Sequence, residues 1–195
     1  MGQNSRPVLK NKAERFEEFI LPYERGIYFT CLRILSHRED AEDCAQETML
    51  RAFKYFESFN YQSKPSTWLY RIAYNCCMDF IKKRGNAISI DDLSDEDLED
   101  DSPSLYLKIE ESERRRLLKE AISELPDIFR PPIVLCDLQG LSYQEAADIM
   151  DLPLGTLKSR ISRARNRLKK ILLKNGELFA GNGSLIDAGG KNNEL

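Results

Sequence analysis

The sequence has 195 residues, of which 42% are hydrophobic and 31% are charged, and its formal net charge is -3. This length allows one ordinary domain or two small ones, and the composition is typical of a charged, soluble protein with packed cores. No apolar stretch approaches the roughly 20 residues that a membrane-spanning helix needs, and the N-terminal residues contain no apolar signal segment. These features exclude direct insertion in a membrane and predict a cytoplasmic location.

The cysteines and the single histidine argue against a metal site and against an enzyme. The five cysteines form no Cys-x-x-Cys pair, although a structural zinc site needs four Cys or His ligands in paired spacing. A catalytic triad would depend on His37, which has no glycine-rich oxyanion loop beside it, and no glycine-rich phosphate loop occurs. We therefore predict no metal, no cofactor and no catalytic activity. The adjacent Cys76 and Cys77 fall in a helical stretch, where buried packing is more typical than oxidant sensing.

Residues 13–84 are expected to form a helical bundle after an N-terminal arm, residues 1–12. Small and apolar residues recur there in steps of three and four, which predicts one buried helix face. They are Ala41, Ala45, Thr48, Ala52, Phe56 and Phe59. Another face of the same helix carries charged and amide side chains around one leucine. It consists of Asp43, Gln46, Glu47, Leu50 and Lys54. By itself this second face is typical of an ordinary solvated surface.

A second helix of this bundle is expected to begin near Thr67, whose hydroxyl can cap it, and to continue toward residue 82. Trp68 lies on it with helical spacing to apolar neighbours, which favours a role in the core over an exposed stacking surface. Both roles stay open at this point, and Tyr70 and Tyr74 share the ambiguity.

Residues 85–108 interrupt the helical pattern with a run of acidic side chains. Between Asp91 and Asp101, eight of eleven residues are Asp or Glu. Such a block cannot bury enough apolar surface to fold, so we expect a flexible linker between two domains. It is either a solvated spacer or a polyanionic strand that imitates nucleic acid in the basic channel of a partner. Residues 176–195, rich in glycine and asparagine, are predicted to be a disordered tail.

Residues 109–175 contain the sharpest local signal, a helix-turn-helix pattern. Ser142 and Glu145 have the spacing of a capping box, in which each side chain bonds the other residue's backbone amide at the start of a helix. Pro153 and Gly155 then interrupt this helix, and Thr156 is expected to begin the next one. A helix, a short turn and a second helix form the arrangement that places a recognition helix in the major groove of DNA.

The second of these helices has one apolar and one basic side. The apolar side consists of Leu157, Ile161, Ala164 and Leu168. The opposite side and its flanks carry the candidate DNA-binding residues, among which Arg163 is best placed to read a guanine while most of the other cations suit phosphates. They are Lys158, Ser159, Arg160, Ser162, Arg163, Arg165, Asn166 and Arg167. Because no acidic residue occurs between residues 152 and 176, DNA binding is favoured over a merely solvated basic helix.

Three motifs follow one another along the chain, and the third continues through the turn of the helix-turn-helix. They are residues 40–48 (DAEDCAQET), residues 67–75 (TWLYRIAYN), and residues 138–147 (LQGLSYQEAA) with 152–165 (LPLGTLKSRISRAR). In this order they resemble the bacterial RNA polymerase sigma factors of the extracytoplasmic-function (ECF) group, which keep only sigma regions 2 and 4. One departure is Pro131–Pro132, which falls where relatives continue a helix. Because interior prolines disrupt helices, we expect the helix to restart at one of these two residues.

The resemblance implies that residues 13–84 form region 2, which binds core RNA polymerase through the clamp helices of its largest subunit. The polymerase-binding residues would be Asp40, Asp43, Gln46, Glu47 and Leu50. Region 2 would also capture a base of the melted -10 promoter strand with the loop at residues 59–66 and the helix that follows. The -10 residues would be Asn60, Tyr61, Lys64, Ser66, Arg71, Asn75, Lys82 and Arg84.

Region 4, residues 109–175, would by the same resemblance recognise the -35 duplex with its basic helix and meet the polymerase flap. A dedicated anti-sigma factor is a further implied partner, which could hold the protein at the membrane. The expected fold is all-α, with two small helical domains, the region 2 bundle and the region 4 helix-turn-helix, joined by the acidic flexible linker. Two alternatives are a free helix-turn-helix regulator, which would need a dimer interface that the sequence does not indicate, and an anti-sigma-like adaptor.

Overall fold

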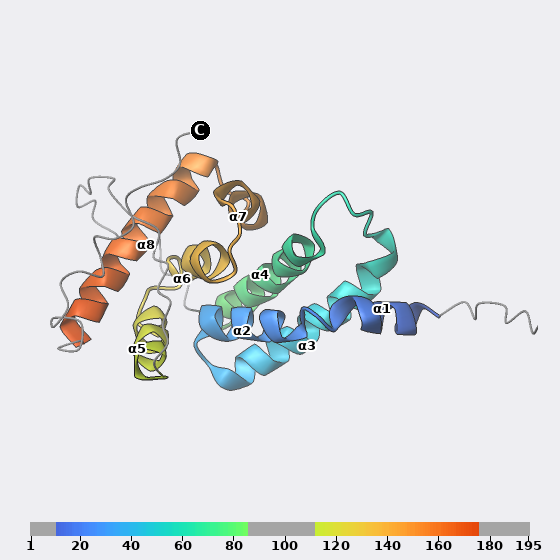
Figure 1. Cartoon of the computed structure of the whole chain (residues 1–195), viewed down its shortest axis with the longest axis horizontal. Helices are drawn as coiled ribbons and strands as arrows, with labels where there is room; N and C mark the ends of the chain where they lie inside the picture. The colour runs from blue at the N-terminus through green and yellow to red at the C-terminus, as the bar shows by residue number, and fades with distance from the viewer. Residues whose placement is uncertain (1–10, 86–111, 176–195) are drawn as a thin grey trace, which may run out of the picture.

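The computed structural model describes residues 11–85 and 112–175. Residues 1–10, 86–111 and 176–195 are drawn as a thin grey trace in Figure 1. The expectations for most of the N-terminal arm, for the acidic linker and for the C-terminal tail therefore lie outside the described residues. Within the described residues all regular secondary structure is helical, and the predicted all-α fold is confirmed. None of the helices in those two ranges is long and apolar enough to cross a membrane.

The helices form two bundles that follow each other along the chain (Figure 1). The first consists of α1 (Lys12–Ile20), α2 (Glu24–Leu35), α3 (Arg38–Tyr55), the 3₁₀ turn η1 (Phe56–Ser58) and α4 (Pro65–Lys83). The second consists of α5 (Ser112–Ser123), α6 (Arg130–Pro132), the π-helical η3 (Ile133–Leu138), α7 (Tyr143–Met150) and α8 (Leu154–Asn175).

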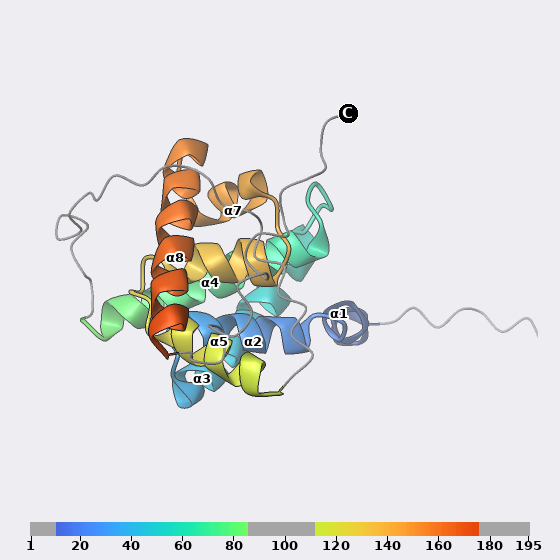
Figure 2. The same cartoon turned by 60° about the vertical axis from the view of Figure 1, so that its left-hand side comes forward.

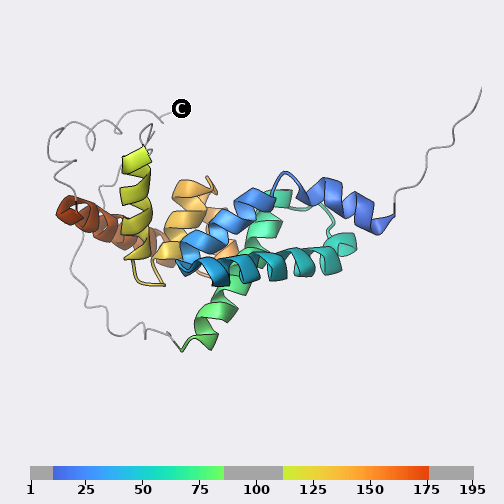
Figure 3. The same ribbon diagram turned by 90° about the horizontal axis from the view of Figure 1, so that it is seen from below.

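In the first bundle, α2 and α3 run side by side and α4 crosses them (Figure 3). The small-residue face predicted for α3 is buried at Ala41, Ala45, Thr48 and Ala52, and Cys44 joins it. Small side chains let the helices approach closely, so this face of α3 packs directly against both neighbours.

Helix α4 begins two residues earlier than the sequence pattern predicted. Pro65 occupies its first turn, where the missing N–H costs no hydrogen bond and the fixed φ angle already suits a helix. The capping role predicted for Thr67 is wrong. The Thr67 hydroxyl instead donates a hydrogen bond to Glu145 Oε1 in the second bundle, at 3.1 Å.

The second bundle contains the predicted helix-turn-helix. The capping box is present: the Glu145 amide donates to Ser142 Oγ at 3.2 Å, and the Ser142 amide donates to Glu145 Oε2 at 2.9 Å. Helix α7 ends at Met150, its C-cap residue Asp151 has a positive φ of 53°, and α8 begins at Leu154 instead of at Thr156. Figure 2 shows α5 packed against the C-terminal half of α8.

The chain restarts as a helix at Arg130, one residue before the prolines. Pro131 and Pro132 occupy the first turn of α6, as the sequence predicted within one residue. In the first turn of a helix the amides have no partner within the helix, so two successive prolines are tolerated there.

The two bundles pack against each other, which the sequence did not predict. Helix α7 lies beside α4 (Figure 1). Tyr70 of α4 belongs to the core of the second bundle with Leu135 and Leu157, while Val134 of η3 belongs to the core of the first. Arg130 also reaches across and donates to the Ile34 carbonyl at 2.6 Å. In the described part of the chain, the two bundles are therefore joined by an interface to which both contribute buried residues.

Candidate functional site

The outer side of α8 carries a row of cations and hydroxyls. The four predicted apolar residues of its inner side are buried, as expected. Among the predicted DNA-binding residues, Lys158, Ser159 and Arg167 are exposed, and Arg160, Ser162, Arg163 and Asn166 are half-buried. The Arg167 guanidinium also lies over the ring of Phe129, 5.1 Å from its centroid. With the exception of one arginine, α8 therefore presents the predicted set on one side.

That exception is Arg165, which the sequence placed with the DNA-contacting cations. Its side chain is only 9% exposed and forms two hydrogen bonds to the Asp137 carboxylate, at 3.1 and 2.6 Å. The hydrogen bond to Asp137 raises the pKa of Arg165 above its ordinary value. The guanidinium thus fixes α8 to η3 and is not available to a phosphate.

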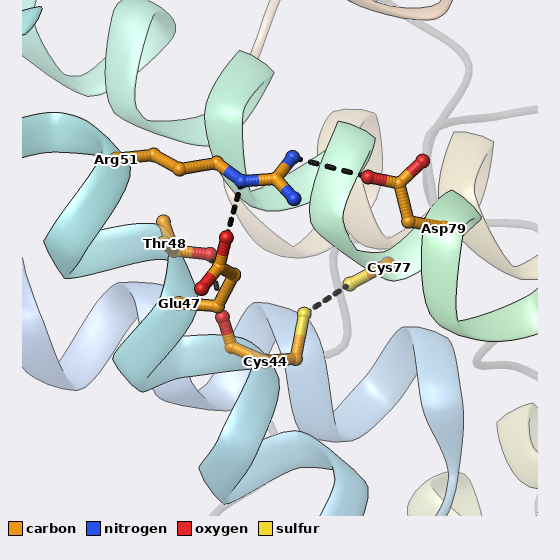
Figure 4. Close-up of polar contacts among 6 residues, drawn as sticks. All are labelled: Cys44, Glu47, Thr48, Arg51, Cys77 and Asp79. Atoms are coloured by element: carbon orange, nitrogen blue, oxygen red, sulfur yellow. Dashed lines mark hydrogen bonds and ion pairs between the residues drawn. The ribbon is translucent and has the colours of Figure 1, made fainter.

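The outer face of α3 combines acidic and amide groups with one apolar side chain. Asp43 and Gln46 are exposed, and Leu50 is 66% exposed, which is unusual for a leucine in a folded domain. Glu47, on the same face, accepts a hydrogen bond from Arg51 Nε at 2.6 Å (Figure 4). The centre of the face predicted to meet the polymerase is therefore exposed to solvent.

Arg51 connects this face to α4. Its second hydrogen bond is donated to Asp79 Oδ2 at 3.0 Å (Figure 4), and the two hydrogen bonds that Arg51 donates to Glu47 and Asp79 raise its pKa. Sequence reasoning did not place Arg51 in a site, although it follows directly after the predicted face. Asp40, at the start of α3, is paired with Arg84 at the end of α4. This pair joins a residue of the predicted polymerase-binding set to one of the predicted -10 set.

A hollow of about 430 Å³ lies between α3 and α4. Its lining includes Glu47 and Leu50 from the predicted polymerase-binding set and Asn75 from the predicted -10 set. The fold thus brings together two sets of residues that the sequence kept apart.

The loop before α4 is exposed at its tip. Asn60 Oδ1 accepts a hydrogen bond from the Gln62 amide at 3.3 Å, and Tyr61 has a positive φ of 59° with its side chain 67% exposed. The Tyr61 ring lies 4.7 Å from that of Phe59, which in turn stacks on Trp68. An exposed aromatic ring on a built aromatic base is a suitable surface for stacking with a nucleic-acid base.

Two other members of the predicted -10 set contact α7 while their side chains stay exposed. Lys64 pairs with Glu145 at 3.6 Å, and Arg71 donates to the Asp148 carbonyl at 3.2 Å. Ser66 is half-buried and Lys82 is exposed. The sequence could not reveal these contacts, because Glu145 already had a local role in the capping box.

Trp68, Tyr70 and Tyr74, for which the sequence left a core role and a stacking role as alternatives, are packed in the structure. Trp68 lies against the first core and stacks on Phe59 with ring centroids 4.7 Å apart. Tyr70 is 8% exposed, and Tyr74 packs on the second core. The core role is therefore confirmed for all three. Cys76 and Cys77 are also buried, as predicted.

Comparison with known proteins assigns each bundle to a family region. The sequence matches the sigma-70 region 2 family over residues 19–87 and the sigma-70 region 4 family over residues 115–168. It is 35% identical over 176 residues to the ECF RNA polymerase sigma factor SigW of Bacillus subtilis, and the match covers 85% of this chain and 92% of SigW. The chain belongs to the ECF sigma factors. A second relative, the RNA polymerase sigma-H factor of Pseudomonas aeruginosa, is 32% identical over 173 residues, with 85% and 90% covered.

Solved structures support the same assignment of this ECF sigma factor. The sigma factor RpoE of Bartonella quintana, determined in complex with the anti-sigma factor NepR, is 30% identical with a TM-score of 0.63, and the match covers 84% of this chain and 99% of RpoE. CnrH, determined in complex with the cytosolic domain of CnrY, is 20% identical with a TM-score of 0.60 and shows a similar fold, over 84% of this chain and 91% of CnrH. As a member of this family, the chain is an alternative sigma factor that binds RNA polymerase and directs promoter recognition.

Proposed function

We propose that this ECF sigma factor docks on core RNA polymerase through the outer face of α3 and uses separate elements for the two promoter motifs. The polymerase contact centres on Leu50, with Asp43 and Gln46 beside it. An apolar anchor within an acidic and amide-bearing face suits a basic groove on the clamp helices, because complementary charge steers the encounter while apolar contact supplies affinity. The exposure of Leu50 is the observation that carries this proposal.

Promoter DNA is divided between the two regions. The basic side of α8 enters the major groove of the -35 duplex, where Arg163 reads a guanine and Lys158 meets a phosphate. The loop with Asn60 and Tyr61 holds a flipped base of the melted -10 strand, and Asn75 offers its amide to the same strand.

The protein has no catalytic role of its own. Its only histidine, His37, is the N-cap residue of α3 and accepts a bond from the Asp40 amide, which is a structural role. The polymerase supplies the chemistry. We place the protein in the cytoplasm, with an anti-sigma factor as a partner, because the similar RpoE was solved with one. That partner would cover the polymerase-binding and DNA-binding faces, and it could hold the protein at the membrane.

The test is run-off transcription with purified core polymerase and genomic promoter fragments, using wild type and Asp43→Arg. The wild type is expected to direct discrete start sites. The variant is expected to lose at least tenfold in transcript, because the new cation faces a basic partner. Glu17→Arg is the matched control, since Glu17 is an exposed acid on a different helix, α1, and it should transcribe as wild type.

Two outcomes would contradict the proposal. Equal transcription by wild type and Asp43→Arg would show that the outer face of α3 is not the docking face. If the wild type shifted duplex DNA but added no start site to core polymerase, the free helix-turn-helix regulator would replace the initiation factor.

A further inference from the structure

Three cysteine thiols meet in the centre of the region 2 bundle. Cys31 comes from α2, Cys44 from α3 and Cys77 from α4, and all three are fully buried. Their sulfur atoms lie within 4.8 Å of one another, and the Sγ atoms of Cys44 and Cys77 are 3.6 Å apart (Figure 4). This cluster lies beneath the surfaces proposed to meet polymerase and DNA and is not part of either.

The sequence predicted no metal site, because the cysteines have no paired spacing along the chain. That argument holds for a site built from one or two loops. In the fold, three helices each contribute one ligand, so spacing along the chain no longer decides the matter. The tertiary structure therefore makes a metal site possible again, because it brings together cysteines that lie up to 46 positions apart in the sequence.

The distances within the cluster suit a thiophilic cation. A Zn–S bond of about 2.3 Å places two sulfur ligands of a tetrahedral ion roughly 3.8 Å apart, close to the separation of Cys44 and Cys77. Thiolate ligands select Zn²⁺ and Cu⁺ over Mg²⁺ or Ca²⁺. Cys76 belongs to the same core, but its sulfur lies outside this group of three and would have to approach to serve as a fourth ligand.

The surroundings fix the ligands in place. The Thr48 hydroxyl donates to the Cys44 carbonyl at 2.7 Å and holds that turn of α3 (Figure 4). The cluster belongs to the same core as Ile27, Leu69 and Ala73, whose apolar side chains exclude water. A site with rigid neighbours and only sulfur donors disfavours hard cations.

We propose that Cys31, Cys44 and Cys77 bind one closed-shell thiophilic cation, either Cu⁺ with the three thiolates alone or Zn²⁺ with Cys76 drawn in as a fourth ligand. Each coordinating thiol releases its proton, so uptake of the ion releases three or four protons and involves no change of oxidation state. Because the ligands come from α2, α3 and α4, the ion links these three helices and stabilises region 2.

The test uses the full-length protein, stripped of metal and reduced under anaerobic conditions. Co²⁺ serves as the probe for the zinc arm, and Cu⁺ buffered by a chromophoric chelator serves for the copper arm. Each ion is added both to the folded protein and during refolding, so that burial of the site cannot hide binding. We expect thiolate charge-transfer absorption that saturates at one ion per chain in one arm, and in the cobalt arm its loss on addition of one equivalent of Zn²⁺.

The variants identify the ligands. Cys44→Ala and Cys77→Ala should each abolish the absorption, while Cys76→Ala should abolish it only if the ion is four-coordinate zinc. Cys136→Ala is the matched control, because Cys136 is a buried cysteine in the core of the second bundle, and it should bind as wild type. Circular dichroism establishes that each variant is folded.

If a variant fails to fold, the thermal stability of the wild type with and without the ion still tests the proposal. When the free ion concentration is about a hundredfold above the dissociation constant, the ion should raise the Tm of a chain of this size by roughly 5 to 10 °C. Absence of the absorption and of the Tm shift in both arms overturns the proposal. So does retention of stoichiometric binding by folded Cys44→Ala, or equal loss of binding in Cys136→Ala.

Discussion

At the scale of single residues, Arg165 shows that charge alone does not assign a DNA contact. It lies among basic residues on α8, yet it is buried against Asp137, which is itself only 10% exposed. Two buried opposite charges gain little relative to an apolar pair, but removal of one leaves the other without compensation in a dry environment. Arg165 is thus important for the stability of region 4 and not for DNA affinity directly.

We expect Arg165→Ala to lower the free energy of unfolding by about 3 kcal/mol, because the Asp137 carboxylate would stay buried without its partner. The measurement is urea denaturation followed by circular dichroism. Lys158→Ala, at an exposed position of the same helix, should change stability by less than about 0.5 kcal/mol. The double variant Asp137→Leu with Arg165→Leu should recover most of the loss, and a double variant no more stable than Arg165→Ala would contradict this account.

At the scale of elements, the first turn of α7 has two roles. Glu145 closes the capping box of its own helix and also accepts the Thr67 hydroxyl and pairs with Lys64 of region 2. Hydrogen bonds from the Ser142 amide and hydroxyl are the main cause of a pKa of Glu145 that lies below its ordinary value of 4.5, and Thr67 and Lys64 add to the effect. One carboxylate therefore connects a helix cap to the interface between bundles.

This gives a pH dependence with a defined sign. Because the pKa of Glu145 is lower in the folded than in the unfolded chain, its carboxylate stabilises the fold fully above pH 4.5, and the stabilisation is lost as the pH falls through the lower, folded value. Glu145→Gln cannot titrate, so its free energy of unfolding should fall less steeply than that of wild type below pH 4.5. Urea denaturation in a pH series measures this, and an unchanged acid slope in Glu145→Gln would show that the carboxylate has no such role.

At the scale of the whole molecule, the two sigma regions are packed against each other, and two residues of the proposed -10 surface contact region 4. A chain of hydrogen bonds crosses the interface: Tyr70 donates to Gln139 Oε1 at 2.8 Å, and Gln139 Nε2 donates to Thr30 Oγ1 at 2.9 Å. Gly26 permits this contact, because a Cβ there would lie 2.9 Å from the Tyr70 hydroxyl. Lys64 and Arg71 also contact α7 with exposed side chains, so a promoter strand would compete with these contacts for the two cations.

We expect Gln139→Ala to favour separation of the bundles, because it removes two hydrogen bonds and leaves the partly buried Tyr70 hydroxyl without its acceptor. A loss of about 1 to 2 kcal/mol corresponds to a shift of roughly 5- to 30-fold in the equilibrium. Energy transfer between dyes on α1 and α8 measures it. Gln144→Ala is the control, since the Gln144 amide bonds Asp148 within α7, and equal transfer efficiencies in the two variants would argue against the predicted role of Gln139.

The sequence by itself determined the helical class, the order of the motifs, the capping box at Ser142 and the apolar sides of α3 and α8. These depend on residues three or four positions apart, and the helical period expresses them locally. Boundaries were less certain, as the early starts of α4 and α8 show. Only the tertiary structure decided which charged groups are paired, that Lys64 and Arg71 contact α7, and that three scattered cysteines meet. Such contacts join residues as far apart as Thr30 and Gln139, and no local pattern encodes them, because they result from the packing of whole helices.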